Sequence, residues 1–241
     1  MDGTYDFENV HFSYGDEKEI LSGLDLHVKK GETIAFVGPS GAGKTTIINM
    51  IIGFYLADSG RVSLDGRDIK DIDLRTYRKH IAVVPQSPVL FTGSIRDNIA
   101  YGCENVSDDD IMEAVRMANL SEFISSLPLG LDTRVGEHGA QLSGGQRQRV
   151  SIARAVIRKP DVLIFDEATS ALDSVSEKLI QDAIYRVSEG RTTFLVAHRL
   201  STIKNADRIA VISGGKCSEL GTYDELMALK GEFYNLKMLQ S

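Results

Sequence analysis

Residues 38–45 read Gly-Pro-Ser-Gly-Ala-Gly-Lys-Thr and match the phosphate-binding pattern G-x-x-x-x-G-K-[ST] at every fixed position. Glycines in such a loop let the backbone wrap a phosphate, and the helix that starts there adds a partial positive charge. In this pattern Lys44 reaches the β- and γ-phosphates, and the Thr45 hydroxyl holds Mg²⁺. The glycine spacing is not G-x-G-x-x-G, which disfavours a dinucleotide. The sequence therefore predicts a nucleoside triphosphate site formed by Gly38, Ser40, Gly41, Ala42, Gly43, Lys44, Thr45 and Thr46.

A metal-bound triphosphate also requires a carboxylate, and residues 162–167 supply two. Four apolar residues lead into Asp166 and Glu167, which lie at the carboxyl end of an expected strand. Ligands gather at that end of a parallel sheet. We expect Asp166 to bind Mg²⁺ and Glu167 to polarise a water for in-line attack on the γ-phosphate. Taken alone, an acidic pair after a strand is usually a solvated turn or a helix cap, and the phosphate-binding loop is what favours catalysis.

The elements that must position these residues alternate between strands and helices. A buried strand at 33–37 leads into the glycine loop, and a helix from 43 to about 52 follows, with Gly53 placed to cap it. Further strands are expected at four places: 81–84, 162–165, 193–196 and 209–212. This alternation predicts an α/β fold with a mostly parallel sheet.

Two regions differ from that core. Apolar and polar residues alternate over 5–14 and 20–28, which indicates an N-terminal antiparallel β subdomain. From about 87 to 159 the pattern is helical, with Ser107 before three aspartates as an N-cap. We expect one domain over residues 1–241, divided into a β subdomain with the core, about 1–86 and 160–241, and a helical subdomain, about 87–159.

Composition narrows the classes of partner. The 241 residues carry 27 Lys and Arg against 34 Asp and Glu, a net charge of −7 that disfavours bulk nucleic acid and anionic membrane surfaces. Cys103 and Cys217 have no metal-ligand spacing and fit a reducing compartment. No apolar run approaches the roughly 18 residues of a membrane span, and no secretory signal opens the chain. By itself we expect a soluble cytosolic polypeptide.

A second glycine pair lies before the acidic residues, in Leu142-Ser143-Gly144-Gly145-Gln146, which Arg147-Gln148-Arg149 follows. Ser143 and the N–H groups of Gly144 and Gly145 can form another phosphate cradle at a helix N-terminus. In this combination the chain resembles, over nearly its whole length, the nucleotide-binding domain of the ATP-binding cassette (ABC) family. The resemblance implies a P-loop NTPase, RecA-like core.

The resemblance also implies cofactors and partners, namely ATP, Mg²⁺ and a second nucleotide-binding domain. In the family, the signature of one subunit (here Ser143, Gly144, Gly145 and Gln146) closes over ATP on the phosphate loop of the other, in a head-to-tail dimer. The partner domain is identical or different. Transmembrane domains on the same or another chain complete the assembly, and no nucleic acid is expected.

Other residues match family positions one by one. Tyr14 resembles the aromatic residue that stacks on adenine, although alone it is a strand tyrosine. Gln86 resembles the glutamine that senses Mg²⁺ and the attacking water. Asp173 ends the Ser170–Asp173 segment, which resembles the loop that communicates across the dimer. His198 resembles the switch histidine at the γ-phosphate.

Two further segments resemble the exporter branch. Residues 133–137 resemble a segment that contacts intracellular loops of the membrane domains, and 88–95 resemble part of the groove for a coupling helix. A generic interpretation, a loop and apolar helix packing, stays open for both. We expect either the C-terminal domain of a longer membrane protein or a separate subunit, at the cytoplasmic face of a membrane.

The sequence thus favours an ATP-hydrolysing motor domain of an exporter, with Lys44, Gln86, Glu167 and His198 in catalysis. An importer ATPase subunit is the alternative. A DNA-acting cassette ATPase is disfavoured because Lys44 and Asp166 lie too close for an intervening coiled coil, and a non-catalytic module because Glu167 is present. A small-molecule kinase has no use for the signature, and Ser143 lacks the G-x-S-x-G context of a hydrolase.

Overall fold

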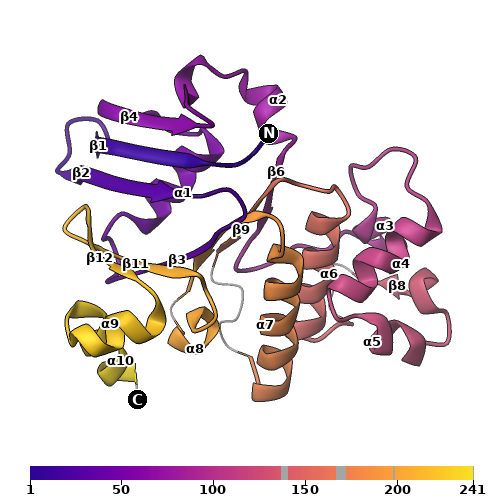
Figure 1. The fold of residues 1–241 in the computed structure, drawn as a ribbon. Helices are drawn as coiled ribbons and strands as arrows, with labels where there is room; N and C mark the ends of the chain where they lie inside the picture. The colour runs from indigo at the N-terminus through magenta and orange to yellow at the C-terminus, as the bar shows by residue number, and fades with distance from the viewer. Residues whose placement is uncertain (137–140, 167–171, 198, 241) are drawn as a thin grey trace. The chain divides into compact units, whose positions relative to one another are not determined.

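The computed structural model describes residues 1–136, 141–166, 172–197 and 199–240, which group into two compact units (Figure 1). The first unit comprises Met1–Ile81, Asp161–Ile164 and Gly190–Ser241. The second comprises Ala82–Pro160 and Phe165–Glu189. The chain therefore leaves the first unit and returns to it twice.

The first unit opens with an antiparallel sheet in the order β2-β1-β4-β5. Its strands are β1 (Tyr5–Ser13), β2 (Glu19–Val28), β4 (Ser59–Leu64) and β5 (Arg67–Asp68). Tyr5 pairs with Val28 on one side and with Leu64 on the other. Tyr5 and Phe7 are buried in the core, and after a register shift so are Val10 and Phe12, so that burial alternates on each side of the shift.

A second sheet has the order β12-β11-β3-β10-β9-β6. Its strands are β3 (Thr33–Val37), β6 (Ile81–Val84), β9 (Val162–Asp166), β10 (Thr192–Val196), β11 (Arg208–Ser213) and β12 (Lys216–Gly221). Strand β3 pairs in parallel with both β10 and β11, whereas β12 runs antiparallel to β11. All five residues of β3 are buried, which explains its unbroken apolar character.

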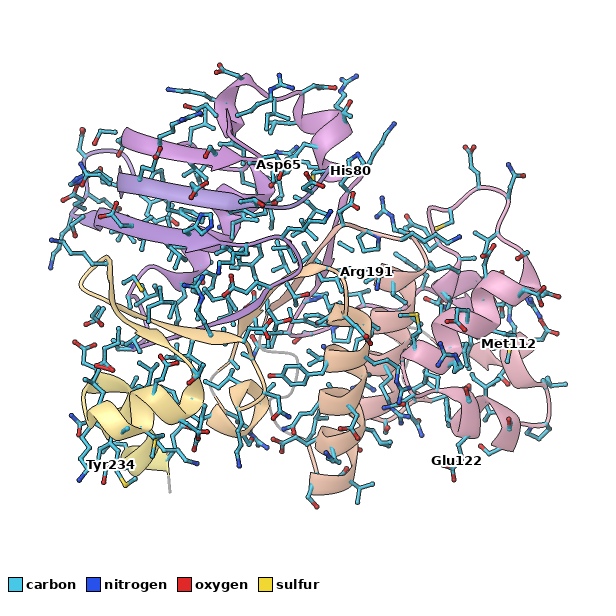
Figure 2. All side chains as sticks on the ribbon, in the orientation of Figure 1. Asp65, His80, Met112, Glu122, Arg191 and Tyr234 are labelled. Carbon is cyan, nitrogen blue, oxygen red and sulfur yellow. The ribbon has the colours of Figure 1, made fainter. Side chains whose placement is uncertain are left out.

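Helix α1 (Lys44–Ile52) follows β3 and buries six of its nine residues. The other helices of the first unit are η1 (Ile69–Asp71), α2 (Leu74–Arg78), α8 (Leu200–Ile203), α9 (Tyr223–Leu229) and α10 (Glu232–Gln240). The Asp65 carboxylate, labelled in Figure 2, accepts backbone N–H groups of Gly3 at 3.0 Å and Thr4 at 2.9 Å. These bonds fix the start of β1 against the turn after β4.

The second unit is mainly helical. It contains α3 (Ile95–Ile99), α4 (Asp108–Met117), α5 (Ser121–Ser126), η2 (Gly130–Asp132), α6 (Gly144–Val156) and α7 (Ser174–Ser188). Helix α6 packs on α3, α4 and α7. Ser107 caps α4 in a reciprocal pair with Asp110, as the run of aspartates predicts.

The second unit also contains one short two-stranded antiparallel sheet. Strand β7 (Gly93–Ser94) pairs antiparallel with β8 (Arg134–Val135), with Gly93 opposite Val135. The two segments that the sequence analysis relates to the exporter branch are therefore neighbours, although about forty residues separate them.

The expected elements differ from the observed ones mainly at their ends. The strands expected at 33–37 and 81–84 have those bounds, and the helix expected from 145 begins one residue earlier. Helix α7, which the sequence analysis left unassigned, groups with the helical region and extends it past residue 159. Among the described residues, none of the helices combines the length and apolar character needed to cross a bilayer.

Candidate nucleotide-binding site

The glycine loop between β3 and α1 has the backbone conformation of an anion-binding turn. Gly41 has φ 77° and Gly43, the N-cap of α1, has φ 112°, both in the left-handed region. No side chain caps α1, and its first turn holds no acidic residue. The first turn therefore supplies no carboxylate to neutralise the positive end of this helix, which favours an external anion.

Lys44 lies within this loop. Its Nζ donates a hydrogen bond to the Gly38 carbonyl at 2.7 Å, and the residue is only 6% exposed. The ammonium is thus held over the same backbone that would surround a phosphate. This position agrees with the role that the motif predicts for Lys44.

Gly38 is required for the packing behind the loop. Its φ is 148°, and a Cβ at this position would lie 2.1 Å from the Ile212 carbonyl oxygen. Strand β11 can approach the loop because residue 38 has no side chain. At the mouth of the loop, Ser40, Gly41 and Thr45 are exposed, whereas Thr46 is buried.

Tyr14 forms a hydrogen bond with Thr46, two residues after Lys44 in α1. Its hydroxyl lies 2.8 Å from Thr46 Oγ1. Its ring makes edge contacts with Phe12 and Tyr55, at centroid distances of 4.9 and 5.3 Å. The contact with Thr46 joins Tyr14 to α1, and stacking on adenine stays a prediction.

The signature motif forms the N-terminus of α6 in the second unit. The Ser143 side chain accepts the Gln146 backbone N–H at 3.2 Å, and Gln146 Oε1 accepts the Ser143 N–H at 2.9 Å. This capping box satisfies two backbone donors within the motif itself. Ser143 is exposed, so its hydroxyl lies at the surface.

The signature glycines also have a packing reason. A Cβ at Gly145 would lie 2.8 Å from the Cβ of Ser176, and one at Gly144 would lie 3.2 Å from Leu172 Cδ2. Helix α7 can therefore approach α6 closely at Gly145 because this residue has no side chain. The sequence indicated that these glycines form a phosphate cradle. In the fold, the packing of Ser176 and Leu172 against them also requires small residues.

The remaining described site residues lie at the ends of elements. Gln86 is exposed two residues after β6, and Asp166 is the last residue of β9. Asp173 is the N-cap of α7, and its carboxylate accepts the Ser176 backbone N–H and hydroxyl, both at 2.9 Å. These hydrogen bonds, the backbone one foremost, lower the pKa of Asp173.

Several predicted residues lie outside the described part of the chain. They are the catalytic candidates Glu167 and His198, the Ser170–Ala171 part of the loop before Asp173, and Glu137 of the segment 133–137. Their roles stay predictions.

The donor set suits the metal that the motifs imply. Within the described residues, no three His, Cys, Asp or Glu side chains gather as a metal cluster. The predicted ligands are the Thr45 hydroxyl, the Gln86 amide and the Asp166 carboxylate, all oxygen donors. Mg²⁺ prefers oxygen and commonly takes few protein ligands beside substrate phosphates. The residues present therefore fit a magnesium–triphosphate complex.

The profile of the family described as "ABC transporter" matches residues 21–170, more than half of the chain. The chain belongs to the ABC transporter family. The match includes the phosphate loop, the signature and both acidic residues, so the predicted P-loop fold with its antiparallel β subdomain and helical insert is confirmed.

Relatives of this ABC domain include multidrug resistance protein 1 of Entamoeba histolytica, 50% identical over 99% of this chain and 19% of that protein. An ATP-dependent lipid A-core flippase of Syntrophus aciditrophicus is 47% identical over 98% of this chain and 39% of that protein. A solved bacterial Atm1-family ABC exporter with ATP bound has a TM-score of 0.91 and 42% identity, over 100% of this chain and 42% of that one. This chain therefore spans less than half the length of each.

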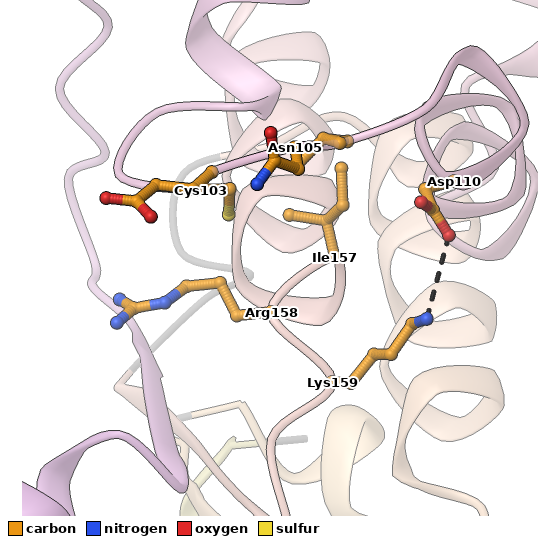
Figure 3. A pocket seen from close by; sticks show the side chains of 8 residues that line it. Cys103, Asn105, Asp110, Ile157, Arg158 and Lys159 are labelled. Carbon is orange, nitrogen blue, oxygen red and sulfur yellow. Dashed lines mark ion pairs between the residues drawn. The ribbon is translucent and has the colours of Figure 1, made fainter.

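The ABC domain has a separate hollow in its second unit, with a volume of 360 Å³ (Figure 3). Its charged lining residues are Glu104, Asp110, Arg158 and Lys159. Lys159 Nζ lies 3.6 Å from the Asp110 carboxylate. Two acids therefore balance two bases, and the hollow lacks the net positive charge that a phosphate site needs.

Two polar side chains of the ABC domain, Asn98 and Arg154, belong to none of the predicted site motifs. Both hydrogen-bond to backbone groups of the segment that follows Gln86. Their partners are main-chain atoms far away in sequence, and such contacts leave no periodicity or spacing by which to find them.

Proposed function

We propose that this chain binds and hydrolyses ATP as the motor domain of an ABC exporter. The observation that carries the proposal is the buried ammonium of Lys44, held by the Gly38 carbonyl inside a glycine loop at an uncapped helix N-terminus. Such a loop suits a triphosphate, because its backbone N–H groups and its cation can both bind phosphate oxygens. The names of the relatives, multidrug and lipid exporters among them, favour export over import.

Each site residue has a defined task in this proposal. Lys44 binds the β- and γ-phosphates, and Thr45 and Asp166 hold Mg²⁺, which when bound neutralises phosphate charge. Glu167 accepts a proton from the attacking water, which Gln86 helps to orient, and His198 contacts the γ-phosphate. Phosphoryl transfer depends mainly on such positioning and charge stabilisation.

The proposed partners are a second cassette and membrane domains. The exposed Ser143 at the N-terminus of α6 would contact the γ-phosphate held by the other cassette. An exposed apolar patch supports docking of a membrane domain to the second unit. It comprises Val89 (55% exposed), Phe91 (43%) and Tyr101 (57%). Such patches on otherwise polar surfaces mark interaction sites.

The test measures mass by size-exclusion chromatography with light scattering on Glu167→Gln, with and without Mg-ATP. We expect a dimer that forms only with ATP, because the variant retains binding and loses hydrolysis. In parallel, phosphate release should fall by about a hundredfold or more in Glu167→Gln while ATP affinity stays within about twofold. Unchanged turnover in the variant would refute the role of Glu167.

Wild-type protein without measurable phosphate release would favour a non-catalytic nucleotide-binding module. A monomer that persists with ATP, despite turnover in the wild type, would mean that a different cassette or attached membrane domains are needed for closure.

A further inference from the structure

The segment after Gln86 is held by the side chain of Asn98, which is 1% exposed. Asn98 Oδ1 accepts the Phe91 backbone N–H at 2.8 Å. Its Nδ2 donates to the carbonyls of Phe91 and Ser94, at 3.0 and 2.9 Å. One buried amide therefore satisfies three main-chain groups of a segment that is mostly irregular.

Arg154 of α6 completes the arrangement. Its Nη2 donates to Asn98 Oδ1 at 2.9 Å, its Nε to the Asn98 carbonyl at 2.9 Å, and its Nη1 to the Val89 carbonyl at 2.8 Å. The guanidinium also lies 5.2 Å from the centroid of the Phe91 ring. Partial burial lowers its pKa by removing water from the cation. The three acceptors and the ring replace part of that lost solvation. The Asn98 and Arg154 side chains are called the clamp below.

The same helix holds the segment at an earlier point. Gln148 is 3% exposed, and its Nε2 donates to the Pro85 carbonyl at 3.3 Å, beside Gln86. Helix α6 thus contacts the segment at Pro85 through Gln148 and at Val89 through Arg154. The N-terminus of this helix is the signature cap at Ser143. The Gln86 segment and the signature motif are therefore attached to one rigid element.

We propose that Asn98 and Arg154 are positioning residues, which hold the 85–94 segment, with Gln86 near its start, in a fixed place on the signature helix. The proposal rests on the function proposed above. Within the described residues, neither side chain contacts a predicted ligand atom. The clamp acts by making Gln86 and Ser143 move together, so that closure at the signature also sets the glutamine that orients the attacking water.

Lysine cannot replace Arg154 in this arrangement. The three nitrogens of a guanidinium lie in one plane and serve three acceptors at once, whereas an ammonium is a single point. The cation also faces the Phe91 ring, which forms a 4.3 Å pair with the exposed Tyr101. The clamp therefore also fixes the apolar patch proposed to meet the membrane domain.

Residue-resolved hydrogen exchange tests the clamp on the whole chain, without regard to turnover. The reporter is the Phe91 amide, and the reference is the Leu120 amide, which donates to the Val115 carbonyl in α4 at 2.9 Å. In Arg154→Met the Phe91 amide should exchange at least about tenfold faster, because charge-assisted hydrogen bonds are lost, while Leu120 is unchanged. Arg158→Met, which removes an exposed arginine four residues on, is the matched control and should change neither amide.

Two results would overturn the clamp. One is an unchanged Phe91 amide, and the other is equal acceleration at Phe91 and Leu120, which would show a general loss of stability. If Arg154→Met does not fold, Arg154→Lys carries the same comparison, since it keeps the charge and removes the planar fork.

A kinetic cycle tests the link to Gln86. Arg154→Met should lower kcat about tenfold or more while KM for ATP stays within about twofold, because the phosphate loop is untouched. Combined with Gln86→Ala, it should add nothing to the effect of Gln86→Ala alone. Additive losses would overturn the assignment. A wild-type chain without turnover would refute the proposed function, and hydrogen exchange would still decide the clamp.

Discussion

Helix α1 begins at Gly43, which offers no side-chain acceptor, whereas helix α6 begins at Ser143, which caps it in a reciprocal pair with Gln146. Both N-termini are proposed to contact phosphate. The first has no side-chain cap and no acidic residue in its first turn, whereas the second is satisfied by its own side chains. A site completed by a partner's nucleotide must remain stable while exposed, and a capping box provides that. The difference supports the proposal that α1 holds the nucleotide of its own chain and that α6 meets the nucleotide of a partner.

The largest effect is expected on stability. It tests whether the loop before α1 needs a backbone conformation and a close contact that only glycine allows. Gly38→Ala would place a Cβ 2.1 Å from the Ile212 carbonyl oxygen at φ 148°. Because a main-chain atom must move, we expect a loss of about 3 kcal/mol or more in the free energy of unfolding, measured by urea denaturation.

Gly41→Ala is the matched control for that variant. A Cβ there meets nothing within 4 Å, and only the left-handed φ of 77° is strained. We expect a cost of about 1–2 kcal/mol. Equal losses in the two variants would contradict the role given to the contact with Ile212.

A smaller effect is expected on ATP affinity when the Lys44 cation of the phosphate loop is removed. Lys44→Met should weaken ATP binding about a hundredfold, about 2.8 kcal/mol, because a charged hydrogen bond to phosphate is lost. Titration with a fluorescent ATP analogue measures this loss. Lys204→Met, which removes an exposed lysine elsewhere in the same unit, should bind normally. Full affinity in Lys44→Met would contradict the proposal that α1 holds the nucleotide of its own chain.

The smallest effect separates capping from docking at α6. Ser143→Ala should cost about 1 kcal/mol of stability, since the N-cap is lost. Ser143→Asp keeps a good cap and should stay within about 0.5 kcal/mol of the wild type by thermal denaturation. The added carboxylate should nevertheless abolish ATP-dependent dimerisation in the Glu167→Gln background, through repulsion of the γ-phosphate. A dimer that forms in Ser143→Asp would mean that α6 does not meet the nucleotide.

Local sequence patterns predicted the elements that depend on local chemistry. The bounds of β3 follow from its unbroken apolar run, and Gly53 ends α1 in the left-handed conformation that a C-cap glycine predicts. Helix α7 was predictable too, because Ile180, Ala183, Ile184 and Val187 repeat at helical spacing, all of them buried.

The clamp was beyond prediction for a physical reason. Asn98 and Arg154 act on carbonyls of Val89, Phe91 and Ser94, and a carbonyl is present at every residue. Nothing in the sequence marks which ones face an arginine until α3 and α6 have packed. The same holds for the candidate site. Its motifs are contiguous in sequence and could be predicted, whereas the contact of Tyr14 with Thr46 joins residues far apart in sequence and could not.

The β7–β8 ladder has a consequence for how the second unit folds. Joining Gly93 to Val135 closes a loop of roughly 40 residues, at an entropic cost of about 3 kcal/mol. A pairing of two residues per strand supplies few hydrogen bonds, each contributing about 1 kcal/mol net. The ladder cannot nucleate the unit, because it cannot offset that cost alone. We therefore expect the ladder to form late in folding, after α3 and α4 have packed on α6. Substitutions in β7 or β8 should then mainly change the rate of unfolding.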